Sequence, residues 1–394
     1  MSAPLPMSSA LRDRLIALRR DLHGHPELAF KEERTASVLN RELASLSPVQ
    51  LERVAGTGLV ARIAGRNSTA PLVAIRGDID ALPIQEATGL SFASTTAGVM
   101  HACGHDVHAT WAIGAAALLS ADPADGDVLI VLQPGEEVGE GALAMLESGV
   151  LDDVQVIFGA HVDRRFTVGQ VVAQAGPLAA SADDFAIELI GRGAHGARPH
   201  ESADPVIGIA ALVVALQTIV SRRVNPAIPA VVTVGMISAG TASNVIPDRA
   251  TLRGTLRATD EATRTTLREE VRLIATHVAI AHGLEARVTL GQGVPPVINT
   301  EDAAAWASDA ARSVVGPDAV VPLGTPNMAA EDFAWYLTRM QGCFMRIGAR
   351  HAGEPFIPAH SPLFDVAEDA ILVGASVLAE SARKASSALM RRQS

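Results

Sequence analysis

Short apolar strands alternate with stretches of helical spacing through the first 160 residues, and this pattern constrains the fold most. The predicted strands cover residues 56–63, 72–75, 127–132 and 154–159. Such alternation is typical of a mostly parallel sheet with helices on both faces. Polar residues directly follow these strands, namely Asp78, Glu136, Glu137 and His161. Because sites gather beyond the carboxyl ends of such strands, we expect these residues to share one site.

The pattern changes near Ser181. Residues 184–190, 230–237, 250–256 and 286–290 are predicted strands, with helices over 205–220 and 262–281. This order predicts an inserted ferredoxin-like α+β domain. The predicted boundaries are 1–180 for the first part of the main domain, 181–292 for the insertion and 293–394 for the return. His360 would otherwise lack companions.

Composition narrows the possible partners. The 394 residues suggest two domains, and the net charge of -11 without a Lys/Arg run argues against nucleic acid. Only Cys103 and Cys343 are present, which indicates a reducing cytoplasm. Residues 1–10 lack the pattern of a signal peptide, and the apolar run Val206–Leu216 is too short to span a bilayer. We therefore expect a cytoplasmic protein without a membrane partner, in which that run is a buried helix.

The stretch Met100–His108 concentrates one thiol, three imidazoles and one carboxylate. Cys103 and His105 lie two residues apart beside a glycine, so both can turn toward one point. Soft and borderline donors at this density suit zinc or a similar transition metal. A lone free cysteine is more often a structural thiol, but the surrounding histidines favour a ligand here.

Each candidate ligand or base downstream of this stretch carries a weaker signal when it is considered alone. Adjacent residues leaving a strand point in different directions, so one of Glu136 and Glu137 can bind metal while the other acts as a base. The alternative is a solvated pair of loop carboxylates. His161 alone would more often be a core histidine, and His360 alone would mean nothing. The remaining histidines of these regions are expected to be structural: His23, His25, His101 and His108.

Taken together, the motifs resemble the metal-dependent amidohydrolases that include aminoacylases, hippurate hydrolases and plant auxin-conjugate hydrolases, within the superfamily of dinuclear zinc carboxypeptidases. The resemblance runs in order from about residue 11 to 385. Two departures are Val107, where the family usually has glycine, and Gly135, where alanine is common. The motifs that carry it are Arg76–Pro83, Met100–His108, Gln133–Glu137, His161, Gly193–His195, Ser243–Asp248, Ala330–Phe333 and His360–Phe364.

The resemblance implies hydrolysis of the amide bond of N-acyl amino acids at two divalent metal ions per chain, of zinc, manganese, cobalt or nickel. Glu136 would be the general base, and Asp78 would hydrogen-bond and orient a ligand histidine. The implied metal ligands are Cys103, which would bridge the ions, with His105, Glu137, His161 and His360.

The insertion carries a further implication of the same resemblance. His195 would reach the partner subunit's active site in a homodimer joined through the inserted dimerisation (lid) domains, and would stabilise the oxyanion. Asn244 would assist it. The alternative for His195 is a turn histidine held by local hydrogen bonds.

Other functions stay open at this point. A dipeptidase or carboxypeptidase would use the same scaffold. A cysteine hydrolase would use Cys103 with a histidine base and would need neither Glu137 nor His360. A non-enzymatic metal-storing or ligand-binding protein would not need the base at Glu136.

Overall fold

The computed structural model describes residues 7–325 and 328–393. The chain divides into two compact units. The first comprises Met1–Gly176, Ile298–Gly324 and Trp335–Ser394, and the second comprises Pro177–Val297 and Thr325–Ala334.

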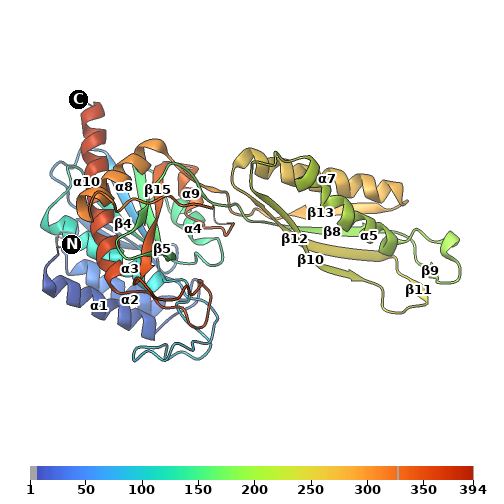
Figure 1. The fold of residues 1–394 in the computed structure, drawn as a ribbon, viewed down its shortest axis with the longest axis horizontal. Coiled ribbons are helices and arrows are strands. Elements are labelled where there is room, and N and C mark those ends of the chain that lie inside the picture. The colour runs from blue at the N-terminus through green and yellow to red at the C-terminus, as the bar shows by residue number, and fades with distance from the viewer. Residues whose placement is uncertain (1–6, 326–327, 394) are drawn as a thin grey trace. The chain divides into compact units, whose positions relative to one another are not determined.

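The first unit is built on a seven-stranded sheet with the order β1-β2-β4-β3-β5-β15-β6 (Figure 1). Its central strands β4, β3, β5 and β15 pair in parallel, whereas β1, β2 and β6 pair antiparallel. The bounds are β1 Gln50–Val54, β2 Gly58–Ile63, β3 Leu72–Asp78, β4 Val128–Gln133, β5 Val154–Thr167, β6 Val171–Val172 and β15 Gln341–Arg350. The predicted α/β class with a mostly parallel central sheet is confirmed.

Helices cover this sheet. Helix α3 (His105–Ala121) packs on β3 and β4, and α10 (Asp369–Gln393) packs on α3 and β15. Almost every residue of α3 up to Ala116 is buried, which explains why its sequence is apolar all round rather than on one stripe. The other helices are α1 Ser9–Gly24, α2 Glu33–Ala44, α4 Gly141–Glu147, α8 Glu301–Val314 and α9 Ala334–Leu337.

The second unit has an antiparallel sheet with the order β10-β12-β8-β13. With its helices, the chain order β8-α5-β10-β12-α7-β13 is the ferredoxin-like arrangement predicted for the insertion. Helices α5 and α7 contact each other and pack on this sheet (Figure 1). The main bounds are β8 Asp183–Ile190, α5 Pro205–Leu216, α6 Thr218–Arg222, β10 Ala230–Ala239, β12 Arg249–Ala258, α7 Glu261–Ala281 and β13 Glu285–Leu290. Shorter elements are β7 Gly176–Ala179, β9 Ala194–His195, the 3-10 turn Pro199–Glu201, β11 Val245–Ile246 and β14 Val297–Asn299.

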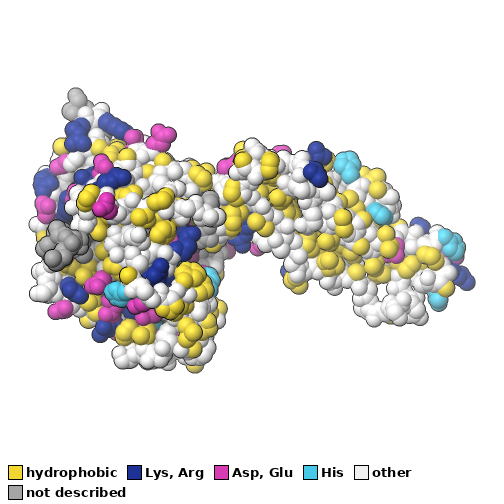
Figure 2. Space-filling view, viewed as in Figure 1, with side chains coloured by type: hydrophobic (Ala, Val, Ile, Leu, Met, Phe, Trp, Pro, Cys, Tyr) yellow, Lys and Arg dark blue, Asp and Glu magenta, His cyan; other side chains and the backbone are white. Residues whose placement is uncertain are grey.

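The apolar run in this unit differs from its prediction in two ways. Helix α5 buries only one face, since Ile209, Leu212 and Leu216 are buried whereas Ile207 and Val214 are exposed. The helical stretch also continues through α6, so that Pro205–Arg222 is by length and composition apolar enough to cross a membrane, with a third of it buried. Figure 2 shows hydrophobic side chains on the surface where Figure 1 labels α5.

Candidate metal centre and active site

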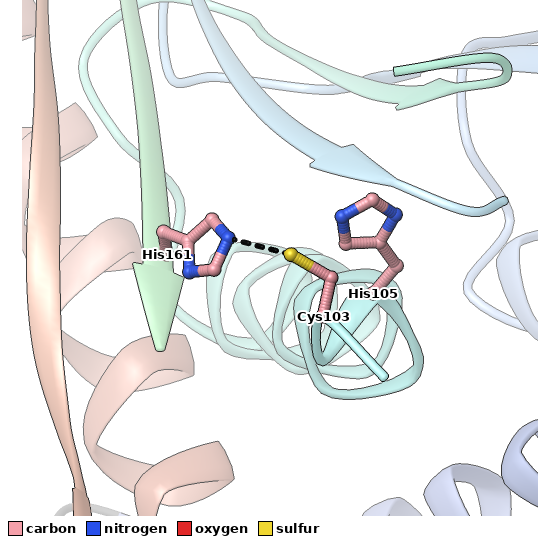
Figure 3. A group of neighbouring side chains, drawn as sticks. All are labelled: Cys103, His105 and His161. Atoms are coloured by element: carbon pink, nitrogen blue, oxygen red, sulfur yellow. Dashed lines mark hydrogen bonds between the residues drawn. The ribbon is translucent and has the colours of Figure 1, made fainter. Parts of the chain in front are cut away.

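Cys103 and His105 flank a tight turn at the start of α3. Gly104 between them has φ 89°, a left-handed conformation that favours glycine. A Cβ atom at this position would lie 2.5 Å from Cγ2 of Val162. The turn therefore packs closely on β5, and Figure 3 shows the Sγ atom of Cys103 pointing between the rings of His105 and His161.

His161 lies within β5, not after it as predicted. The strand continues to Thr167 because it pairs with β15, in which Arg346 lies opposite His161. His161 Nδ1 donates to the carbonyl of Val162 at 2.7 Å, and its Nε2 atom lies 3.2 Å from Cys103 Sγ. Burial lowers the pKa of His161 well below its usual range. The ring is thus a neutral imidazole whose Nε2 lone pair faces the thiol, as metal binding requires.

Glu136 and Glu137 follow β4 and reach the same place. Oε2 of Glu136 and Oε1 of Glu137 each lie 3.8 Å from Nε2 of His105. Both side chains are only slightly exposed. The two carboxylates therefore face one imidazole nitrogen from adjacent positions, as a ligand and a base would.

His360 comes from the loop before α10. Its backbone has φ 66°, a conformation unusual for a residue other than glycine, and its N–H donates to the carbonyl of Ala102 at 2.8 Å. Its Nε2 atom lies 3.5 Å from Oε1 of Glu137. The buried Arg164 supports this loop by donating to the backbone carbonyls of Pro355 and Asp365, a role that no sequence motif indicates. All five predicted ligands, which we call the cluster, thus converge: Cys103, His105, Glu137, His161 and His360.

The prediction for Asp78 needs correction, because Asp80 is the residue that orients a ligand histidine. Nδ1 of His105 donates to the carbonyl oxygen of Asp80 at 2.9 Å and to its Oδ1 atom at 3.1 Å. Asp80 Oδ2 also accepts the backbone N–H of Glu137 at 3.0 Å. Both carboxylates lie in the motif Arg76–Pro83, but Asp78 is the last residue of β3 whereas Asp80 lies beyond the strand, and their partners differ.

Asp78 instead accepts a hydrogen bond from Nδ1 of His108 at 2.6 Å and one from Arg76 at 2.5 Å. Nε2 of His108 accepts the backbone N–H of Val162 at 3.0 Å. Both nitrogens of His108 are therefore occupied, and the ring stacks on Trp111 with centroids 4.7 Å apart. His108 holds the strand next to His161 in place and has no nitrogen left for a metal.

The residues of the cluster fit a cation. Nε2 of His105 and Oε1 of Glu137 make no hydrogen bond within the described part of the chain, although buried polar atoms are normally paired. Potential ligand atoms lie within 4.8 Å of one another in the sets Cys103/His105/His161 and Cys103/Glu137/His360, which share Cys103. Burial alone would lower the pKa of His105, but the charge of Asp78 and the hydrogen bond to Asp80 raise it well above its usual range. The site thus favours positive charge where a metal ligand is expected.

Three further histidines named in the sequence analysis, His23, His25 and His101, lie outside the cluster. His23 donates to Asp106 at 2.9 Å and lies 3.3 Å from Glu86, while Arg19 bonds Asp106 from the other side. His25 donates to the carbonyl of Asp21. His101 is buried without a hydrogen bond among the described residues, and burial lowers its pKa to about 4. None of the three joins the cluster.

His195 and Asn244 lie side by side in the second unit. His195 pairs with Val245 in the ribbon of β9 and β11, and Gly196 donates to the carbonyl of Asn244 at 2.8 Å. Nδ1 of His195 accepts the backbone N–H of Ala197 at 3.0 Å, so the proton of the neutral ring sits on Nε2. The exposed ring therefore offers a hydrogen-bond donor at its outer edge.

The chain is similar in sequence and in structure to known proteins. The model of Peptidase family M20/M25/M40 matches residues 74–384. The N-acetyl-L-cysteine deacetylase of Bacillus subtilis (strain 168) is 40% identical over 95% of this chain and 89% of its own length. The IAA-amino acid hydrolase ILR1-like 2 of Arabidopsis thaliana is 36% identical over 94% of this chain and 84% of its own. The crystal structure of the Bacillus subtilis YXEP protein, a dinuclear metal binding peptidase from the M20 family, superposes with a TM-score of 0.84 at 36% identity, over 95% of this chain and 98% of that one.

Proposed function

Because the chain belongs to Peptidase family M20/M25/M40 and is an amide-bond hydrolase, we propose that it cleaves N-acyl amino acids into a carboxylate and a free amino acid. One observation carries the proposal: three groups of potential metal-ligating atoms lie together at the site. Two of the groups share Cys103 and one includes Glu136, and their buried atoms His105 Nε2 and Glu137 Oε1 make no hydrogen bond among the described residues. Two relatives are an N-acetyl-L-cysteine deacetylase and an IAA-amino acid hydrolase, and both names describe hydrolysis of this kind.

Two divalent ions per chain would be held by the cluster, whose two sets of potential ligand atoms share Cys103. Thiolate and imidazole donors suit zinc, cobalt or nickel better than calcium or magnesium, and the carboxylate of Glu137 would also suit manganese. When bound, such ions lower the pKa of a coordinated water and polarise the scissile carbonyl.

Glu136 is proposed to be the general base that transfers protons during the reaction. Its carboxylate faces His105 Nε2 at 3.8 Å from the position next to the proposed ligand Glu137. It would accept a proton from the attacking water at its Oε atoms and deliver the proton to the leaving amine nitrogen. Asp80 and the backbone carbonyl of Val162 would keep His105 and His161, respectively, in the tautomer that turns Nε2 inward.

The second unit would complete the reaction in a homodimer. The exposed face of α5 and the edge strand β10 provide apolar surface for pairing two copies, including Val214, Met236 and Ile237. Within the dimer, His195 of one subunit would donate from Nε2 to the oxyanion in the partner's active site, with Asn244 beside it. A preorganised donor of this kind is worth roughly 3 kcal/mol of transition-state stabilisation.

A peptidase on the same scaffold is the second candidate, because the family description and the YXEP relative both name peptidases. A free cysteine nucleophile fits poorly, since burial and the charge of Glu137 raise the pKa of the Cys103 thiol well above its usual range. Both cysteines are buried free thiols, which supports the proposal of a reducing cytoplasm.

The test is a turnover panel. Metal-loaded protein is offered N-acyl amino acids and unblocked dipeptides of matched side chains. Faster hydrolysis of the N-acyl amino acids supports the proposal, faster hydrolysis of the dipeptides favours the peptidase, and hydrolysis of neither contradicts both.

A further inference from the structure

The loop between α1 and α2 is tied to both strand ends that carry the site. Leu28 forms a bridge with Ala81, next to Asp80, and the N–H of Ala81 donates to the carbonyl of Glu27 at 2.9 Å. The buried carboxylate of Glu32 accepts the backbone N–H of Phe30 at 2.9 Å and that of Gly135 at 3.1 Å through the same oxygen. Phe30 is thereby fixed beside the turn that leads into Glu136.

The ring of Phe30 occupies space that only glycine leaves open. Gly135 has φ 63°, and a Cβ atom there would lie 2.6 Å from Cε2 and 2.8 Å from Cζ of Phe30. The aromatic ring thus covers the backbone immediately before the proposed base. Phe30 itself has φ 59°, a conformation that phenylalanine rarely adopts and that the bond to Glu32 helps to hold.

Most of the large apolar side chains that the first unit exposes belong to segments that carry site residues or pack on them. Among its described residues, six large apolar side chains are exposed, and two of these, Val49 and Ile298, lie elsewhere in the sequence. The other four neighbour site residues: Phe30 (38% exposed) covers Gly135, Val138 (53%) follows Glu137, and Phe356 (57%) and Leu363 (53%) flank His360. Exposed apolar groups placed around a polar site indicate contact with an apolar part of the ligand.

We propose that Phe30 is a specificity-determining residue, whose ring forms, with Val138 and Leu363, the surface that receives the acyl group of the substrate. The proposal rests on the proposed function. An N-acyl amino acid has an uncharged acyl half and a half that bears a carboxylate. Exposed apolar side chains gain free energy by removing the uncharged half from water, whereas burying the charged half against them would cost its hydration.

The consequence is a preference for large apolar acyl groups, such as benzoyl or hexanoyl, over acetyl. The experiment measures kcat/KM for benzoyl, hexanoyl and acetyl derivatives of one amino acid, using metal-loaded wild type, Phe30→Tyr, Phe30→Leu and Phe30→Ala. The benzoyl-to-acetyl ratio should fall about tenfold in Phe30→Ala, less in Phe30→Leu and little in Phe30→Tyr. Val49→Ala, which removes part of a more exposed apolar side chain far from Glu136 in sequence, should leave the ratio unchanged.

A parallel series varies the amino-acid side chain under a constant acyl group. The proposal is overturned if the Phe30 variants keep the wild-type acyl ratio, or if they change discrimination among amino acids instead. These results differ from a failure of the proposed function, in which the metal-loaded wild type hydrolyses none of the substrates and both proposals fall. Because the three Phe30 variants form a graded series, loss of folding in one leaves the ratio measurable in the others.

Discussion

Asp80 binds two members of the cluster with one carboxylate: Oδ1 accepts from Nδ1 of His105 at 3.1 Å, and Oδ2 accepts from the backbone N–H of Glu137 at 3.0 Å. The ring of one proposed ligand and the backbone of another are therefore set by the same side chain, which itself lies too deep to meet substrate. Metal ligands are commonly oriented by such partners.

Asp80→Asn should weaken metal binding by roughly 10- to 100-fold, because the amide cannot accept both hydrogen bonds. Metal titration with a competing chelator measures this directly. Asp153→Asn, at an exposed aspartate, serves as the control and should retain the wild-type affinity. Equal affinities for Asp80→Asn and wild type would show that Asp80 does not orient the ligands.

Glu136→Gln and Glu137→Gln should have different effects. Removing the base at position 136 should lower kcat by a hundredfold or more while metal content is kept. Removing the ligand at position 137 should lower metal occupancy first, with activity following it. Metal analysis and kinetics on the same samples separate the two, and exchanged phenotypes would mean that the roles are assigned the wrong way round.

His23 should make stability depend on pH. Burial alone would lower its pKa, but hydrogen bonds to Asp106 and Glu86 raise it to about 9. A histidine whose pKa is higher in the folded than in the unfolded state stabilises the fold fully at a pH below its unfolded pKa of about 6.5. This stabilisation is lost as the pH rises through its folded pKa. The free energy of unfolding should therefore fall by roughly 3 kcal/mol between about pH 6.5 and 9 from this group.

Urea unfolding at several pH values across that window measures the effect. His23→Gln should remove this part of the slope and be less stable than wild type at pH 6. His277→Gln, at an exposed histidine on α7, should leave the slope as it is. The same slope in His23→Gln would assign the pH dependence to other groups.

Much of the fold could be predicted from periodicity, because burial imposes a regular pattern on most elements. The apolar stripe of alanines over residues 301–314 predicts a helix, and α8 has these bounds. Strand β1 is not predicted because it lies at the sheet edge and is mostly polar. The helical spacing of residues 329–339 predicts a longer helix than α9, which covers only Ala334–Leu337.

The site was predictable where chemistry is concentrated in short motifs. Cys103, His105, Glu136 and Glu137 stand out by residue type and by their position at strand ends. The partners of those residues were not predictable, because Asp78 and Asp80 are two residues apart and only the end of β3 decides which one meets His105. Likewise, Phe30 reaches Gly135 across more than a hundred residues of sequence.

His195 tests the proposed dimer. His195→Ala and Glu136→Gln should each be nearly inactive alone. After demonstrated subunit exchange, a mixture of the two should regain activity, because one site of the mixed dimer has Glu136 from one chain and His195 from the other. Full exchange without recovered activity would place His195 in its own chain's site or outside catalysis.

Metal content and hydrolysis measured together on one sample test the central claim most directly. Protein stripped by a chelator is titrated with zinc, manganese, cobalt or nickel, while bound metal and turnover of an N-acyl amino acid are followed. We predict that activity is absent at the start, rises with occupancy and saturates at two ions per chain, and that Cys103→Ala loses both together. Full turnover by a sample verified to contain no metal would contradict the account.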